Sequence, residues 1–261
     1  MVFKDRMDFL AVISGFGVGA IVGLTGVGGG SLMTPLLMGV FRLSPAMAIG
    51  TDLWFAAITK SGGSWAHYRM GHVELRVTKL LLAGSMPATA ATIGLMHLTG
   101  VTKGWAGALT FALGIALLLT AVSVFYKRVW NEVGLRLERV ITPGRRDLLT
   151  VASGVLLGVL VSLSSIGAGA IGATLLLILY PRLPAHRIVG TDIAHAVPLT
   201  LVAGIGHASL GHVDWPLLGA LIVGSLPGIW LGARLTRAMP ENAVRGVLCL
   251  SLLGAGIKVL T

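Results

Sequence analysis

The chain has 261 residues, a mean hydropathy of +0.88 and only 11% charged residues, against about 25% in an average soluble domain. This composition excludes a soluble protein and predicts an integral membrane protein. The net charge of +10 lies in short connections between apolar runs, which is the positive-inside pattern of membrane proteins and not a nucleic-acid-binding patch. The single cysteine, Cys249, excludes an intrachain disulfide, and we interpret it as a packing residue.

Ten apolar runs follow one another and leave almost no room for a soluble domain. They cover residues 8–28, 31–41, 46–66, 80–98, 104–126, 148–166, 169–180, 188–210, 215–233 and 244–260. The predicted fold class is therefore all-α, a polytopic membrane protein. We divide the chain into a first transmembrane repeat (1–126), a cytoplasmic connecting loop (127–146) and a second transmembrane repeat (147–261). The loop is basic, and its charge spacing also permits a short surface helix.

The stretch 23–31, Gly-Leu-Thr-Gly-Val-Gly-Gly-Gly-Ser, interrupts the apolar segment between Phe9 and Phe41. That segment is too long for one membrane crossing, and each glycine in a helix interior costs roughly 0.5–1 kcal/mol relative to alanine. We therefore predict two short helices joined by an irregular break at membrane depth. Irregular backbone in a bilayer is tolerated only where it is buried in protein or lines a watery cavity, so the break marks a site.

An internal duplication relates residues 15–100 to residues 154–240, at an offset of 139 that becomes 140 after one inserted residue. The matched positions include Gly15 with Gly154, Gly19 with Gly158, Gly50-Thr51-Asp52 with Gly190-Thr191-Asp192, His67 with His207, His72 with His212, and Pro87 with Pro227. An aspartate, two histidines and a proline in register exceed the chance agreement of a chain rich in leucine, glycine and alanine.

The topology depends on whether the broken segment of each half crosses the membrane once. If it does, the halves are parallel, and lysines plus arginines number 12 inside and 7 outside. If it turns back or crosses twice, the halves are inverted and the numbers are 14 and 5. The charge bias favours inverted repeats, each with a glycine-broken helical hairpin followed by three long transmembrane helices. This is the architecture of secondary transporters.

The two breaks are the predicted substrate site. A helix beginning near Ser31 or Ala170 would aim its N-terminal amides and positive dipole end at the membrane interior, and bare glycine backbone lets an anion approach. The predicted substrate-binding residues are Thr25, Gly28, Gly29, Gly30, Ser31, Thr51, Lys60, Ser164, Ser165, Gly167, Gly169 and Thr191, with Thr34, Ser162 and Thr174 as further hydroxyl donors. For the scattered Gly15 and Gly19 we predict close helix packing instead.

Three charged residues lie inside apolar runs. Asp52 and Asp192 follow Gly-Thr at equivalent starts of two long helices, where the aspartate or the threonine either caps the helix or serves the substrate. Lys60 lies eight residues after Asp52, about 12 Å along the same helix. Its repeat counterpart is Thr200, so only the first half carries this charge. Lys60 either recognises the substrate anion or forms an ion pair with an aspartate that holds two helices together.

We group His195, which lies deep enough to relay protons, with Asp52 and Asp192 as coupling or ion-pair residues. The other membrane histidines lie near predicted helix ends, where interfacial hydrogen bonding is the commoner role. The spacing of His207, His212 and Asp214 does not match a metal motif, and we expect neither a metal site nor a cofactor.

The chain resembles the TauE/SafE sulfite exporter family, also called the 4-toluene sulfonate uptake permease family. The resemblance covers essentially the whole chain. The resemblance is carried by G-x-G-G-G-S-x-x-x-P from Gly26 to Pro35, Ala48-Ile49-Gly50-Thr51, Ile58-Thr59-Lys60-Ser61-Gly62-Gly63, and the repeated Gly190-Thr191. It implies a secondary transporter of small anions, chiefly sulfite, sulfonates and other organosulfur or carboxylate species.

The resemblance places the family's glycine breaks on Gly28, Gly29 and Gly30, and on Gly167 and Gly169. The second half departs from the pattern, because Ala168 and Ala170 replace the fuller glycine-serine cluster. Asp52 and Asp192 also stand where many members carry a neutral polar residue.

We therefore expect a multi-pass protein of the cytoplasmic (inner) membrane that moves a small sulfur-containing anion by alternating access, coupled to protons or sodium. Membrane lipid is an expected partner and nucleic acid is not. The alternative is a proton-coupled cation or metal-ion transporter using Asp52, Asp192 and the histidines. A membrane-embedded enzyme is disfavoured, because the sequence has no nucleophile elbow and no paired metal-binding acids.

Overall fold

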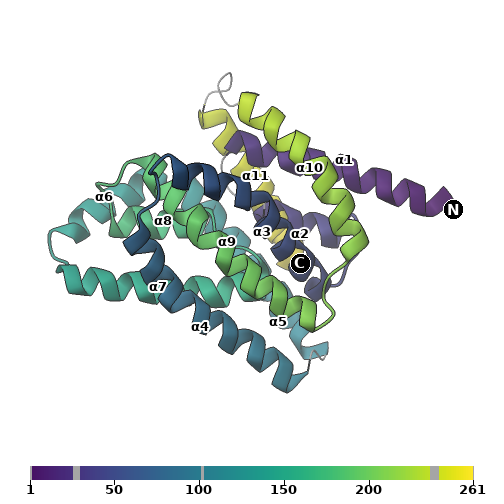
Figure 1. The fold of residues 1–261 in the computed structure, drawn as a ribbon, viewed down its shortest axis with the longest axis horizontal. Coiled ribbons are helices and arrows are strands. Elements are labelled where there is room, and N and C mark those ends of the chain that lie inside the picture. Colours follow the sequence, from purple (N-terminus) through teal and green to yellow (C-terminus); the bar gives the residue numbers. More distant parts are fainter. Residues whose placement is uncertain (1, 26–29, 101–102, 236–240, 261) are drawn as a thin grey trace.

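The computed structural model describes residues 2–25, 30–100, 103–235 and 241–260. Within these ranges the chain forms eleven helices and no strand (Figure 1), which confirms the all-α prediction. Five of the helices, α4, α5, α7, α9 and α10, are long and apolar enough to cross a membrane by length and composition. The protein is therefore a multi-pass membrane protein.

The helices follow the predicted apolar runs in order. The first half contains α1 (Val2–Thr25), α2 (Gly30–Gly39), α3 (Pro45–Arg69), α4 (Leu75–Thr99) and α5 (Lys103–Phe125). The second half contains α7 (Pro143–Ser164), α8 (Ala170–Leu179), α9 (Ala185–Ser209), α10 (Trp215–Leu235) and α11 (Glu241–Leu260). Between them, α6 (Lys127–Glu138) is the short helix that the connecting loop permits. The five helices of one half have counterparts in the same order in the other.

Helices of one half pair with helices of the other. Helix α1 packs along α10, and a β-carbon on Gly15 would lie 2.2 Å from the carbonyl oxygen of Leu221. Helix α7 packs along α4 in the matching way, because a β-carbon on Gly154 would lie 2.2 Å from the carbonyl oxygen of Leu81. Only glycine permits these approaches, so the predicted packing role of Gly15 is confirmed.

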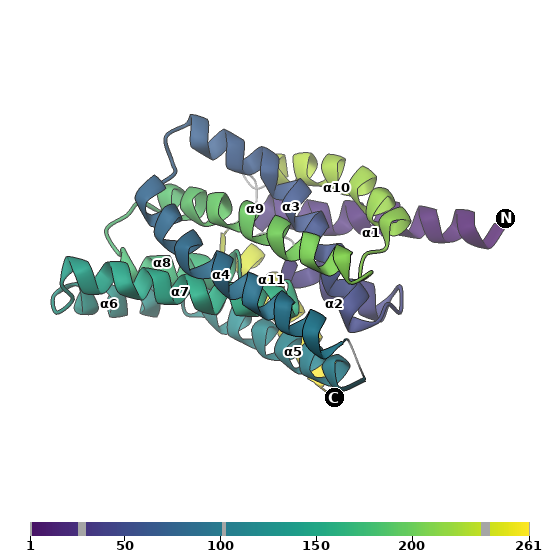
Figure 2. The same cartoon turned by 60° about the horizontal axis from the view of Figure 1, so that its bottom comes forward.

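Helices α3 and α9 cross between these two pairs and occupy the centre of the molecule (Figures 1 and 2). The two helices run in opposite directions. Gly50 of α3 approaches His207 of α9, and Trp54, further along α3, bonds to Gly204, which is earlier in α9. The equivalent helices α3 and α9 therefore lie antiparallel.

The second broken hairpin returns to the end at which it began. Tyr180, just after α8, hydrogen-bonds through its hydroxyl to Thr150 near the start of α7, at 2.9 Å. Arg146 on α7 lies 5.7 Å from the centre of the Tyr180 ring. Helices α7 and α8 thus enter and leave from the same side.

Ion pairs gather at that same end. Glu138 on α6 pairs with Arg182 at 2.8 Å and with Arg146 at 3.7 Å. Two further pairs join the beginning of α4 to the second half, namely Glu74, its N-cap, with Arg187 at 2.8 Å and Arg76 with Asp147 at 2.7 Å. These ion pairs thus lie at the end of the molecule that the charge pattern assigns to the cytoplasm.

Candidate functional site

The second break is irregular backbone, as predicted. Helix α7 ends at Ser164, and Ser165 adopts left-handed backbone with φ 60°. Gly167 and Gly169 have φ values of 130° and 145°, which side chains with a β-carbon rarely adopt. Helix α8 then begins at Ala170, the expected position.

The first break is only partly described. Helix α1 ends at Thr25 and α2 begins at Gly30, which agrees with an interruption of the apolar segment at the predicted place. The predicted residues Gly28 and Gly29 lie outside the described residues. So do the side chains of Thr25 and Ser31, and their predicted role in substrate binding stays a prediction.

Lys60 connects the first half to the break of the second. Its side chain is 7% exposed, and its Nζ donates a hydrogen bond to the carbonyl oxygen of Ala168 at 2.6 Å. It makes no ion pair within 4.0 Å to Asp52 or Asp192, the two carboxylates whose charges it feels most strongly. The lysine therefore places a buried amino group directly against the break.

Asp192 lies at the N-terminus of α8. The Asp192 carboxylate lies close to the backbone of Gly169, the residue before the helix. A β-carbon on Gly172 would lie 2.1 Å from Asp192 Oδ1, so the missing side chain of Gly172 makes room for the carboxylate. The helix end at which we predicted an anion thus holds a carboxylate of the protein itself.

Asp52 has the equivalent position in the first half. Thr34 on α2 donates its hydroxyl hydrogen to Asp52 Oδ2, and Ser165 of the second break also lies against this carboxylate. Asp52 is completely buried, and its Oδ1 has no hydrogen-bond partner. Each aspartate therefore contacts the short helix of its own half, and Asp52 reaches the opposite break as well.

The capping interpretation of the Gly-Thr-Asp sequences is wrong. Helix α3 begins at Pro45, with Ser44 as its N-cap, and α9 begins at Ala185, so both aspartates lie in the second turn or beyond. The two threonines accept hydrogen bonds from other segments. Thr51 Oγ1 accepts from the amide of Asp214, and Thr191 Oγ1 accepts from that of Glu74, each at 3.0 Å.

The serines that end α7 differ in what their hydroxyls do. Ser162 and Ser164 donate to carbonyl oxygens of their own helix, each at 2.7 Å, and Ser164 also accepts from the amide of Ile166. These bonds occupy the hydroxyl hydrogens that we predicted for an anion. Ser165 instead faces the buried charges.

His195 lies in the same buried layer as the charges. It is fully buried and its Nε2 hydrogen-bonds with Ser85 Oγ at 3.0 Å, while Nδ1 has no partner. His207 uses Nε2 to bond the carbonyl oxygen of Ser162 at 2.9 Å. Among the residues that the structure describes, no three histidine, cysteine or acidic side chains come together as metal ligands.

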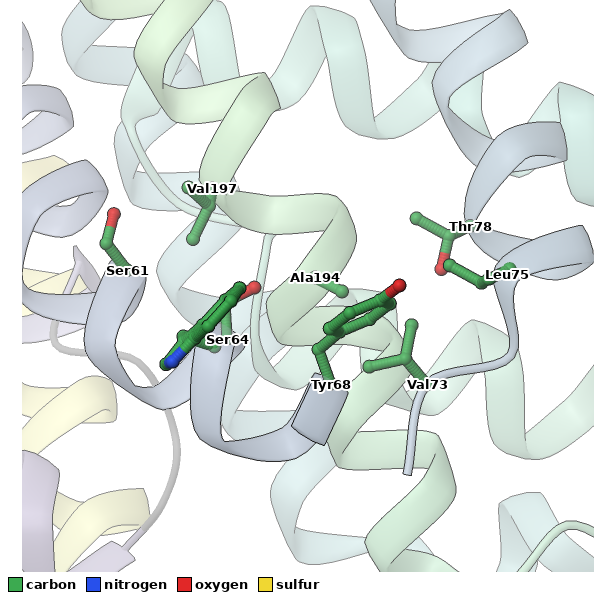
Figure 3. Close-up of a pocket in the computed structure, with 9 residues that line it drawn as sticks. Ser61, Ser64, Tyr68, Val73, Leu75, Thr78, Ala194 and Val197 are labelled. Atoms are coloured by element: carbon green, nitrogen blue, oxygen red, sulfur yellow. The ribbon is translucent and has the colours of Figure 1, made fainter. Parts of the chain in front are cut away.

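An open cavity that the sequence did not predict lies between α3, α4 and α9, with a volume of about 290 Å³. It is lined by Ser61, Ser64, Trp65, Tyr68, Val73, Leu75, Thr78, Ala194 and Val197. Figure 3 shows the serines on α3, Leu75 and Thr78 across the cavity on α4, and the α9 side chains between them. The cavity ends beside Ser61, the residue next to Lys60.

These features define a class: an all-helical, multi-pass membrane protein with a duplicated fold and buried charges at a broken helix. The model of the family described as Sulfite exporter TauE/SafE matches residues 11–259, and the chain belongs to this family. It is therefore a membrane transporter, and the predicted family is confirmed.

Curated relatives agree with this assignment. The probable membrane transporter protein YjnA of Bacillus subtilis is 37% identical over 97% of this chain and 100% of its own length. YdhB of the same organism, also named a probable membrane transporter protein, is 28% identical over 96% of this chain and 99% of its own length. A probable membrane transporter protein of Xylella fastidiosa is 28% identical over 88% of this chain and 85% of its own length. No solved structure matches the chain significantly.

Proposed function

We propose that this protein is a secondary transporter that moves a small anion (sulfite, a sulfonate or another organosulfur anion) across the cytoplasmic membrane by alternating access. The observation that carries the proposal is the buried Lys60 ammonium at the irregular break before α8. A buried cation beside a helix N-terminus provides charge and directed amides for an anion. The family's description supplies the sulfur-containing substrate class.

The position of Asp192 supports coupling of anion binding to a proton or a sodium ion at this site. Its carboxylate contacts the backbone at the start of α8, where a substrate anion would bind. Two negative groups cannot share one helix end without strong repulsion, because buried charges are poorly screened. Protonation of Asp192, or its pairing with a sodium ion, would remove this competition.

The arrangement of the two halves supports alternating access. The equivalent helices α3 and α9 lie antiparallel, and the hairpin of α7 and α8 returns to its starting side. Both features agree with inverted repeats, which place a midplane site between two related halves. An exchange of conformations between the halves would then expose the site to each side in turn.

Ligand-induced stabilisation of the purified protein tests the proposal. A ligand that binds the folded state raises the melting temperature by mass action. We expect sulfite or a sulfonate to stabilise the wild type within a panel that also contains sulfate, thiosulfate and dicarboxylates. The same ligand should lose this effect in Lys60→Ala.

Thr200→Val is the matched control, because Thr200 is the repeat counterpart of Lys60 and bonds only to carbonyls of its own helix. It should keep the ligand response. Stabilisation by divalent cations that survives Lys60→Ala but disappears in the double variant Asp52→Asn, Asp192→Asn would contradict the anion assignment.

A further inference from the structure

The cavity between α3, α4 and α9 reaches the depth of Lys60 along α3, although Lys60 itself does not line it. Its lining on α3 runs from Tyr68 to Ser61, seven residues or about 10 Å along the helix. Tyr68 is near the end of α3, and Ser61 is the neighbour of Lys60 in the sequence. The cavity thus extends from one end of the helix toward the depth of the buried charges.

The repeat provides a second, related position for such a cavity, between α9, α10 and α3. With the offset of 140 residues, cavity residues Ser64 and Leu75 correspond to Gly204 and Trp215. Ala194, on the opposite helix, corresponds to Trp54. At the crossing of α3 and α9, Ala194 and Leu75 on the cavity side thus correspond to two tryptophans on the other side.

Trp54 is partly buried at the related position, whereas Trp215 beside it is 53% exposed. Trp54 Nε1 donates to the carbonyl oxygen of Gly204 at 3.0 Å, and a β-carbon on Gly204 would lie 3.2 Å from the Trp54 ring. The rings of Trp54 and Trp215 lie 5.3 Å apart. Ala57, the counterpart of the cavity residue Val197, is only 3% exposed.

The ion pairs show which end of the molecule the cavity faces. Val73 and Leu75 of the cavity flank Glu74, which pairs with Arg187 at the end that carries α6 and the basic connection. The positive-inside pattern assigns this end to the cytoplasm. The tryptophans lie toward the opposite end, where Asp214 precedes α10.

We propose that this cavity is the cytoplasmic access path by which a small anion reaches the buried charges around Lys60, and that Trp54 closes the repeat-related path on the outer side. The proposal rests on the proposed function for its ligand. The lining fits a small anion, because Ser64 and Tyr68 bring hydroxyl groups and no lining residue is acidic. The other two hydroxyls of the lining, those of Ser61 and Thr78, donate to backbone carbonyl oxygens instead. To open the outer path, Trp54 would have to break its hydrogen bond to the Gly204 carbonyl oxygen.

Thiol labelling measures the two paths without any transport assay. Cys249→Ser removes the single cysteine of the chain. Two variants in this background, Val197→Cys and Ala57→Cys, place thiols at repeat-related positions. Each is treated with a membrane-impermeant maleimide in inside-out and in right-side-out vesicles, and labelling after denaturation gives the total thiol.

We expect Val197→Cys to react at least tenfold faster in inside-out than in right-side-out vesicles, and Ala57→Cys to react slowly in both. Adding Trp54→Ala to Ala57→Cys should raise its labelling at least fivefold in right-side-out vesicles only. If Trp54→Ala fails to fold, Trp54→Phe serves in its place, because it removes the hydrogen bond to Gly204 and should give a smaller increase in the same vesicles.

Three results would overturn the proposal. They are labelling of Val197→Cys from neither side or only from outside, rapid labelling of Ala57→Cys with Trp54 in place, and no response of Ala57→Cys to either Trp54 substitution. The labelling pattern is separate from the proposed function. If the expected labelling is found in a protein that moves no anion, the anion assignment fails. If the protein transports an anion without this labelling pattern, the proposed access path is refuted.

Discussion

The Nζ atom of Lys60, on α3 of the first half, lies 2.6 Å from the carbonyl oxygen of Ala168 in the break of the second half. This hydrogen bond joins the two halves at the place where the backbone is irregular. The ammonium group has further hydrogens to donate, so it can hold the break and still attract an anion.

The packing of α1 against α10 predicts that alanine substitutions at Gly15 and Gly17 differ sharply in their effect on stability. Gly15→Ala should lower stability by about 1–3 kcal/mol, because its β-carbon would overlap the Leu221 carbonyl and push the helices apart. Gly17→Ala, whose β-carbon would meet nothing within 4 Å, should be neutral or slightly stabilising. Thermal unfolding in detergent measures both, and equal melting temperatures would contradict the close approach.

The hydroxyl of Thr191 is predicted to stabilise the fold and not to bind substrate. Thr191→Val should cost about 1 kcal/mol, because the partly buried amide of Glu74 loses its acceptor. Anion affinity of the folded fraction should stay unchanged. Thr110→Val, at an exposed hydroxyl that bonds its own helix, is the control and should have little effect. A selective loss of anion affinity in Thr191→Val would restore the substrate role.

The conformation of Gly169 predicts that the break does not accept a side chain. Gly169→Ala should destabilise the protein by about 1–3 kcal/mol, since φ is 145° there, and should also weaken anion binding by displacing the start of α8. Gly219→Ala on α10 has open space around its β-carbon and should change neither property. Calorimetric titration with sulfite on both variants gives the comparison.

The position of Asp192 predicts how anion binding depends on pH. Lowering the pH should tighten binding to the wild type, because a protonated Asp192 no longer repels the anion from the start of α8. Asp192→Asn is neutral at every pH, so it should bind about tenfold tighter at neutral pH, equivalent to 1.4 kcal/mol, and lose most of the pH dependence.

Asp214→Asn is the control for Asp192→Asn, because Asp214 caps α10 away from the break. It should keep the pH dependence of the wild type. The charged and titratable groups that face Asp192 are Lys60, and through it Asp52 and His195. If Asp192→Asn keeps the full pH dependence, the titrating group is Asp52 or His195 instead.

The repeat and the second break could be predicted from the sequence because both depend on local chemistry. Glycine within an apolar run signals either close packing or irregular backbone, and the structure has the first at Gly15 and the second at Gly167 and Gly169. The matched Gly-Thr-Asp sequences also behave alike in space, since both threonines accept a backbone amide at 3.0 Å. Because the sequence is duplicated, each of these interpretations was supported by two matching motifs and not by one.

The cavity and the partners of the buried charges could not be predicted, because they arise from how α3 crosses α9. The repeat offset pairs Ala194 with Trp54, but nothing in the sequence says that an open cavity lies beside Ala194. The role of the aspartates was misjudged for a simpler reason. The Gly-Thr pair before each aspartate was interpreted as the start of a helix, although α3 already begins at Pro45 with Ser44 as its N-cap.

Anion flux through reconstituted protein tests the central claim most directly. Proteoliposomes containing the wild type should accumulate radiolabelled sulfite or sulfonate under an imposed proton or sodium gradient, and Thr200→Val should do the same. Lys60→Gln keeps a hydrogen-bond donor for the Ala168 carbonyl but loses the charge, so its flux should fall at least tenfold. Undiminished flux in a folded Lys60→Gln variant, or no anion flux in the wild type under any gradient, would contradict the account.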